Sequence, residues 1–307
     1  KNLESNSPAL IGLIDLSDTK AFIRQINLNK NEQISLKIQF EGNTNVLNDS
    51  LIKFDSLDSE IQFDGEIKVT KTNHIFLEEL SVNNKSNVKL NLSGDLSERI
   101  LNLKITGDII DLSANKVEKK KKDKTYYLNQ ENYSIKTDEV IFTGPVKVND
   151  FKADIEKRGQ NLSVNSRASI NGHQLNYSRE KNANLDVNII NSTDITHFVG
   201  NEHPAKKLLS NGEFEMTSIR DLNAQEAKIK IDLNDFVLIN SPASLKLLSL
   251  PSISGLVSIA EGEEGIRFGY GEINYKETDN KFREIEAYAV SDSLGLIMDG
   301  NIDRKKS

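Results

Sequence analysis

The histidines of this sequence do not fall into a pattern that holds a metal or catalyses a reaction. His197 and His203 flank Gly200-Asn-Glu202, which is not the spacing of a zinc motif such as His-Glu-x-x-His. The absence of cysteine excludes thiol chemistry and cysteine-based zinc sites. We therefore expect surface or structural roles for all four histidines, which are His74, His173, His197 and His203.

The acidic residues and glycines are explained better by turns than by an active site. Gly269-Tyr-Gly271 lies between two expected strands, whereas a phosphate-binding loop joins a strand to a helix. Asp108 and Asp111 lack the loop signature of a calcium site. We therefore expect a protein that is not an enzyme and needs no cofactor. A polysaccharide-active enzyme is the weaker alternative, which a pair of carboxylates in a polar cleft would support.

The charge of the chain argues against nucleic acid as a partner. The net charge is −7 over 307 residues, and phosphate binding needs a concentrated basic face. One basic segment, Lys116–Lys124, contains six lysines and is followed by Tyr126, Tyr127 and Tyr133. We expect a solvated loop here because like charges repel, and a patch for anionic headgroups or nucleic acid is the alternative.

Alternation of apolar and polar residues is the main structural signal. It is clear at 34–40, 101–105 and 229–233, and turn clusters separate about fifteen or more such runs. A helical period is confined to short stretches. Ser241-Pro242 starts one of them, an amphipathic cap over 241–260 that falls short of the about 20 apolar residues of a membrane span. Thr193 or Asp194 caps another at 195–199.

The chain reads as two similar halves of a single sheet. At an offset of 206, residues 77–97 align without a gap with 283–303, and apolar and Gly positions coincide. We expect a first β segment at 1–114, the Lys/Tyr-rich loop at 115–135, and a second β segment at 136–307 that carries the 241–260 cap. Lys1-Asn-Leu-Glu is not a signal peptide and both ends are abrupt, so we expect a fragment of a longer protein.

Diffuse Gly, Leu and Asp patterns recur along the chain, at 107–112, 194–200, 209–214, 247–256, 265–268, 294–296 and 300–303. Together they resemble the AsmA-like C-terminal region, which occurs in Gram-negative envelope proteins of the AsmA, YhdP and TamB type. The resemblance is good over 100–307 and looser over 1–99. It implies a non-enzymatic periplasmic protein, anchored to the inner membrane by a segment outside this chain, with envelope protein partners.

The apolar strand faces have two possible roles. A dry core inside a sandwich or β-helix is the default from the residues alone. The resemblance favours the other, in which the mainly β, mostly antiparallel, twisted sheet curls into an elongated groove. Such a groove would take phospholipid acyl chains between the inner and outer membranes or serve outer-membrane maintenance. A structural scaffold or adhesin-like binding module is the alternative. The groove face is predicted to comprise Val88, Leu90, Leu92, Leu101, Leu103, Ile105, Leu185, Val187, Ile189, Ile229, Ile231, Leu233, Leu294, Leu296 and Met298.

Overall fold

The computed structural model consists almost entirely of β-strands, which confirms the predicted fold class. Within the residues that it describes there are twenty strands and one short helix, α1 (Ile195–Phe198). The chain divides into two compact units, Lys1–Gly159 and Gln160–Ser307, each with its own core. The described residues are 9–16, 21–23, 28–30, 36–43, 50–57, 61–70, 72, 74–84, 88–112, 128–142, 147–198, 209–239, 265–278, 282–292 and 294–303.

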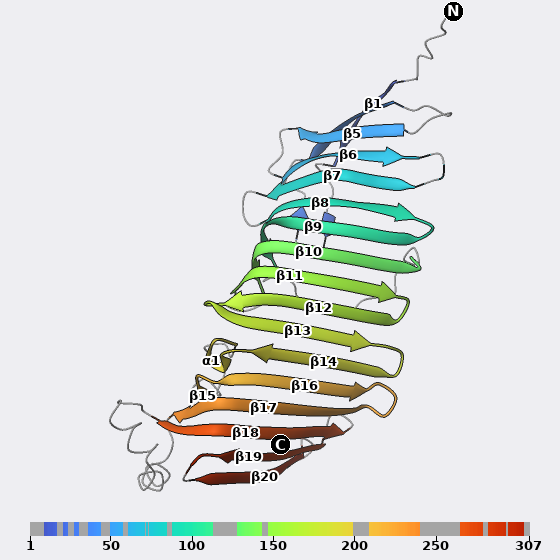
Figure 1. The fold of residues 1–307 in the computed structure, drawn as a ribbon. Coiled ribbons are helices and arrows are strands. Elements are labelled where there is room, and N and C mark those ends of the chain that lie inside the picture. The colour runs from blue at the N-terminus through green and yellow to red at the C-terminus, as the bar shows by residue number, and fades with distance from the viewer. Residues whose placement is uncertain are drawn as a thin grey trace, which may run out of the picture. The chain divides into compact units, whose positions relative to one another are not determined.

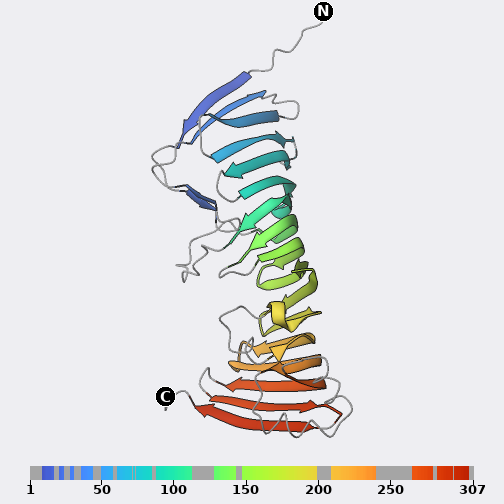
Figure 2. The ribbon, with the colours of Figure 1, turned by 90° about the vertical axis from the view of Figure 1, so that its left-hand side faces the viewer.

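The first unit is a meander of paired strands (Figure 1). Every neighbouring pair is antiparallel except β9 and β10, which are parallel. A separate hairpin of β2 (Ala21–Ile23) and β3 (Leu28–Lys30) lies beside this sheet (Figure 2). The strands follow the order β1 (Ala9–Asp15), β4 (Lys37–Asn43), β5 (Ser50–Leu57), β6 (Ile61–Val69), β7 (Ile75–Asn84), β8 (Val88–Ser97), β9 (Ile100–Asp111), β10 (Gln130–Ile141) and β11 (Lys147–Arg158).

The second unit is an antiparallel sheet with one short extra strand. Strand β15 (Leu209–Ser210) follows α1 and pairs with the end of β17. The remaining strands follow the order β12 (Asn161–Ile170), β13 (His173–Lys181), β14 (Leu185–Ser192), β16 (Glu213–Asp221), β17 (Glu226–Ile239), β18 (Gly265–Thr278), β19 (Phe282–Val290) and β20 (Gly295–Asp303).

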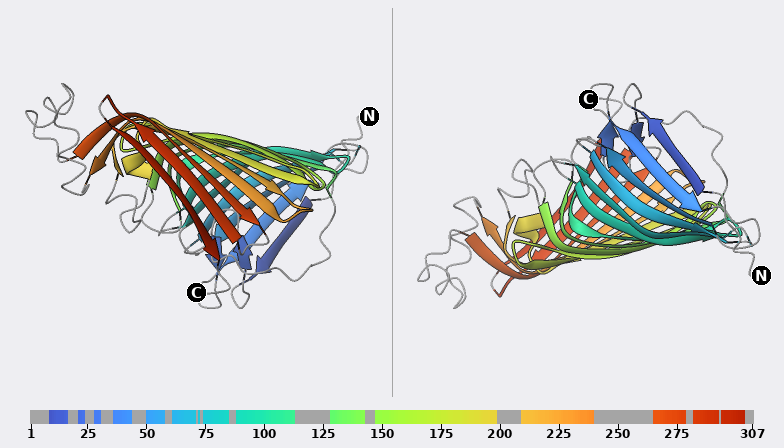
Figure 3. Two further views of the ribbon diagram at one scale, coloured as in Figure 1. Left: turned by 90° about the horizontal axis from the view of Figure 1, so that it is seen from below. Right: turned by 90° about the horizontal axis from the view of Figure 1, so that it is seen from above.

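Local sequence explains both the turns and the twist. Asn171 and Gly172 have positive φ values of 50° and 87° and join β12 to β13, as expected for an Asn-Gly hairpin turn. Within each unit the strands are bent and rotate steadily from one to the next (Figure 3), because right-handed strand twist accumulates across a sheet. The aligned segments 77–97 and 283–303 both form antiparallel hairpins, β7–β8 and β19–β20.

Other expectations need revision or lie outside the described residues. Residues 130–135, expected in a loop, belong to β10, and the compact units divide at Gly159, away from the 115–135 segment. Asp194 does cap α1, since its Oδ1 accepts a hydrogen bond from the Thr196 amide at 2.7 Å. No described helix has the length and apolar content to cross a bilayer. The Lys116–Lys124 segment, His203 and the 241–260 cap lie outside the described residues.

Candidate functional site: a graded sheet face

One face of the second unit changes from charged to apolar along its strands, and we name it the graded face. Residues directly opposite on neighbouring strands share a face, so the register defines rows across it. The first row is charged, the second mixed, and the third and fourth mainly apolar. In order, the rows are Lys181–Asp186–Arg220–Ala227–Glu277; Arg179–Asn188–Ser218–Ile229–Tyr275–Ile285; Tyr177–Ile190–Met216–Ile231–Ile273–Ala287–Met298; and Leu175–Ser192–Phe214–Leu233–Gly271–Ala289–Leu296.

The apolar end of the graded face is a closed core. The rings of Phe236 and Phe268 stack with centroids 5.4 Å apart, and Phe268 has no exposed surface. Ile195 of α1 belongs to the same buried cluster as Phe214 and Leu233. Side chains therefore fill this end, and a ligand has no room there without rearrangement.

The middle of the graded face is only partly covered. Ile229, Ile231 and Ile273 are half-buried. Met298, in the same row as Ile231 and Ile273, has 56% of its surface exposed. An apolar surface that is accessible in this way can take up a further apolar group.

Ion pairs and tyrosines border the apolar rows. Arg179 donates two hydrogen bonds to Asp186, from Nε at 2.8 Å and from Nη2 at 2.6 Å. In the next row Tyr177 donates its hydroxyl to Asn188 Oδ1 at 2.9 Å. Tyr275 donates likewise to Glu277, two residues further along β18, at 2.8 Å. These tyrosines place their rings toward the apolar rows and their hydroxyls toward the charged row, the usual place of tyrosine at an apolar–polar boundary.

The first unit repeats this border. The Tyr133 hydroxyl donates to Glu131 at 2.6 Å, and Lys157 is paired with the same carboxylate. Burial and the Glu131 charge raise the pKa of Tyr133 above its usual range. Although burial opposes it, hydrogen bonds from Lys157 and Tyr133 lower the pKa of Glu131. The border thus has the same tyrosine and ion-pair chemistry in both units.

The predicted residues of the first unit share a face, but part of that face is sealed. Leu92 and Ile105 are directly opposite each other, and Leu90 and Leu103 follow with the same alternation. Leu90 is 1% exposed and Ile105 is 5% exposed, whereas Leu92, Leu101 and Leu103 are half-buried. The face is therefore a packed core at its centre. The side chain of Val88 lies outside the described residues.

In the second unit the predicted residues of β17 and β20 share one face of the sheet, whereas those of β14 lie on the other face. Ile229, Ile231, Leu233, Leu296 and Met298 lie on the graded face, and half-buried Leu294 packs against its core. The other three residues lie on the opposite face. They are Leu185, Val187 and Ile189.

The error on β14 has a physical cause. Ile189 and Ile190 are adjacent, so hydrophobicity does not distinguish the two faces of this strand. The two neighbouring strands determine which face of β14 lies on the apolar side. Met216 of β16 is directly opposite Ile190, and Arg179 of β13 neutralises Asp186. Sequence reasoning missed the tyrosine and ion-pair border. The sequence pattern that indicates this border is a charged residue two positions after each tyrosine, as in Tyr177-x-Arg179 and Tyr275-x-Glu277.

The arrangement suits an amphiphile, with a polar group at the border and an apolar chain over the middle rows. Among the described residues, no group of three or more His, Cys, Asp or Glu is placed to hold a metal ion. Comparison with family models, with curated proteins and with solved structures finds no match.

Proposed function

We propose that this chain is a non-enzymatic lipid-binding segment, and that its graded face takes up phospholipid acyl chains. The observation that carries the proposal is the row-by-row change from the Arg179–Asp186 border to exposed Met298. An amphiphile has the same change along its length. The resemblance to the AsmA-like region points the same way, toward phospholipid movement or outer-membrane maintenance in the periplasm by a protein with an inner-membrane anchor.

The expected affinity is weak, as transfer requires. Full burial of one methylene contributes ~0.8 kcal/mol, so ten half-covered methylenes contribute roughly 4 kcal/mol. This corresponds to a dissociation constant on the order of millimolar for one acyl chain. The second chain of a phospholipid, covered to the same extent, brings the constant to the order of micromolar, at which lipid can remain bound during purification. A lipid held in this way exchanges readily between neighbouring sites.

Mass spectrometry of the purified chain under native conditions, with analysis of released lipid, tests the proposal. Ile231→Glu and Met298→Glu place a charge on the graded face and should abolish copurification of phospholipid. Ile297→Glu is the matched control, because Ile297 is 88% exposed and is the neighbour of Met298 on the other face. A wild-type chain without lipid, or equal lipid in all variants, would contradict the proposal. Met298→Glu keeps the test valid if Ile231→Glu does not fold.

The exposed apolar residues of β20 and β1 favour a second candidate, a scaffold that pairs with a partner strand. Strand β20 pairs with β19, and Ile297 and Met298 are exposed on its two faces. Strand β1 pairs with β4, and its Ile11 is 73% exposed. Exposed apolar strands of this kind can associate with a strand of another chain. Ile297→Lys together with Ile11→Lys should abolish any concentration-dependent association seen by sedimentation, and unchanged association would count against the scaffold.

A further inference from the structure

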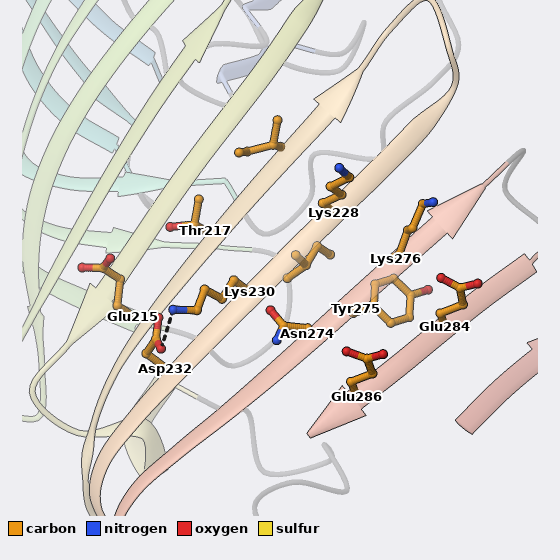
Figure 4. A pocket seen from close by; sticks show the side chains of 12 residues that line it. Glu215, Thr217, Lys228, Lys230, Asp232, Asn274, Tyr275, Lys276, Glu284 and Glu286 are labelled. Atoms are coloured by element: carbon orange, nitrogen blue, oxygen red, sulfur yellow. Dashed lines mark ion pairs between the residues drawn. The ribbon is translucent and has the colours of Figure 1, made fainter. Parts of the chain in front are cut away.

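The opposite face of the second unit contains a pocket that the proposed lipid-binding face leaves unexplained. We name it the polar-face pocket; its volume is about 540 Å³ and it lies across β16, β17, β18 and β19 (Figure 4). Most of its lining side chains belong to the face opposite the graded face. They include Thr217, Ile219, Lys228, Lys230, Lys276 and Glu284.

Two lysines in this pocket lie directly opposite each other, and neither makes an ion pair among the described contacts. Lys228 of β17 is directly opposite Lys276 of β18, an arrangement of like charges that destabilises a sheet. Within the part of the chain that the structure describes, neither has an ion-pair or hydrogen-bond partner. Lys230 differs, since it contacts Asp232 at 3.0 Å and Glu272 at 3.1 Å. An anion between Lys228 and Lys276 would relieve their repulsion.

An exposed apolar patch adjoins the two lysines. Ile219 lies next to Lys228 in the same row, lines the pocket and is 42% exposed. Val187 is directly opposite Ile219 on β14, and Leu185, 39% exposed, is on the same face. An apolar chain that starts at the lysines can therefore run across β16 to β14.

The acidic residues of the pocket limit where an anion can sit. Glu284 faces Lys276 from β19 without an ion pair among the described contacts, and Glu286 follows it on the same face. Asp232 is neutralised by Lys230. Glu284 and Glu286 repel an anion from β19, and Glu215 repels it from the part of β16 opposite Asp232. The end of the pocket at Lys228 and Ile219 remains.

We propose that the polar-face pocket binds a single-chain anionic amphiphile. A phosphate monoester or a similar head group lies between Lys228 and Lys276, and the alkyl chain covers Ile219, Val187 and Leu185. This site is separate from the graded face and goes beyond the proposed function.

The first unit provides a matched control for the lysine pair. Lys136 and Lys152 are also directly opposite each other, on β10 and β11. The residue next to Lys136 in that row is Thr106, where the second unit has Ile219. The double variants K228Q/K276Q and K136Q/K152Q therefore remove equal charge from equivalent arrangements, and only the first lies beside an apolar patch.

Isothermal titration of the chain with dodecyl phosphate, below its micelle concentration, tests the proposal. K228Q/K276Q should weaken binding about tenfold or more, because two charge-assisted hydrogen bonds are lost. K136Q/K152Q should leave binding unchanged. Equal loss in the two double variants would mean unspecific surface attraction, and loss only in Met298→Glu would place the ligand on the graded face. Either result would overturn the proposal.

Two further titrations, one of the Ile219→Asn variant and one with inorganic phosphate, distinguish a site for an amphiphile from a site for free phosphate. Ile219→Asn should weaken dodecyl phosphate binding and leave the much weaker binding of inorganic phosphate as it is. If inorganic phosphate binds as tightly as dodecyl phosphate, the pocket is a site for free phosphate and the assignment to an amphiphile is wrong.

Discussion

The hydroxyl of Thr137 is buried in the first unit without a hydrogen-bond partner among the described residues. Thr137 is 2% exposed and its Oγ1 is unsatisfied. It lies in one row with Gly107 and Phe151, next to fully buried Leu90. A buried unsatisfied hydroxyl costs about 1–3 kcal/mol, so this residue is a weak point of the core.

Thr137→Val should raise the free energy of unfolding by about 1 kcal/mol, because valine has the same shape without the unsatisfied group. Urea unfolding of the two proteins measures the change. Thr106→Val, on the other face of the neighbouring strand, should show no such gain. A loss of more than about 1 kcal/mol in Thr137→Val would show that the hydroxyl has a partner.

The Arg179–Asp186 pair makes the stability of the second unit depend on pH. The hydrogen bonds from Arg179 hold the pKa of Asp186 below its ordinary value of 3.8. The unfolded chain therefore binds the proton more readily than the folded one does. The stabilisation is fully present above about pH 4 and is lost as the pH falls through the lowered pKa of the folded state.

Asp186→Asn should cost about 2 kcal/mol at pH 7, because it leaves a half-buried arginine without its carboxylate. The difference from the wild type should shrink as the pH falls below 4, where the wild type loses the same interaction. Urea unfolding at pH 7 and at pH 3 measures this, with exposed Asp154→Asn as the control. A difference that is constant across this range would contradict the assigned role of the pair.

At the scale of elements, two glycines that the sequence alignment makes equivalent have different surroundings. A Cβ on Gly94 of β8 would overlap the main-chain oxygen of Asn102 on β9. A Cβ on Gly300 of β20 would meet nothing within 4 Å. The close approach of β8 and β9 therefore requires glycine at Gly94.

Gly94→Ala should destabilise the first unit by about 2–3 kcal/mol, because the two strands must move apart. Gly300→Ala should change the free energy of unfolding by less than about 0.5 kcal/mol. Thermal unfolding compares the two variants. Equal effects would mean that the β8–β9 hairpin tolerates the side chain and that this account of its packing is wrong.

The sequence predicted that the strands exist and, for most of them, which residues point to the same side of the sheet. It did not predict where this alternation is interrupted within a strand. Alternation placed Leu92 and Ile105 on one face, and Ile231 and Met298 on another, as the register confirms. It did not predict that pairing skips one row between Thr137 and Glu139.

At that row Asp150 of β11 has a φ of 53°, and buried positions are three apart on β10, at Thr137 and Val140. Asp235 of β17 has a φ of 50° between buried Leu233 and Phe236. Aspartate tolerates a positive φ, but the presence of an aspartate in a strand does not by itself predict one. The point where the spacing of buried residues shifts from two to three depends on the neighbouring strands. The sequence of one strand alone does not contain this information.

At the scale of the whole molecule, each unit has an apolar face bordered by tyrosines and ion pairs. The centre of the face in the first unit is closed, with Leu90 and Val140 each 1% exposed. The graded face of the second unit remains accessible around Met298. Leu90→Glu should therefore unfold the first unit, whereas Met298→Glu should leave the fold intact and remove lipid. Circular dichroism of both variants checks this difference.

We propose that phospholipid acyl chains lie on the graded face at β20 and not on the reverse side of that strand. The chain has no tryptophan, so a single introduced one reports on its own surroundings. Met298→Trp and Ile297→Trp place it at adjacent positions on opposite faces of β20. Phospholipid brominated on its acyl chains should quench the fluorescence of Met298→Trp and spare that of Ile297→Trp. Equal quenching of both variants, or quenching of neither, would contradict the account.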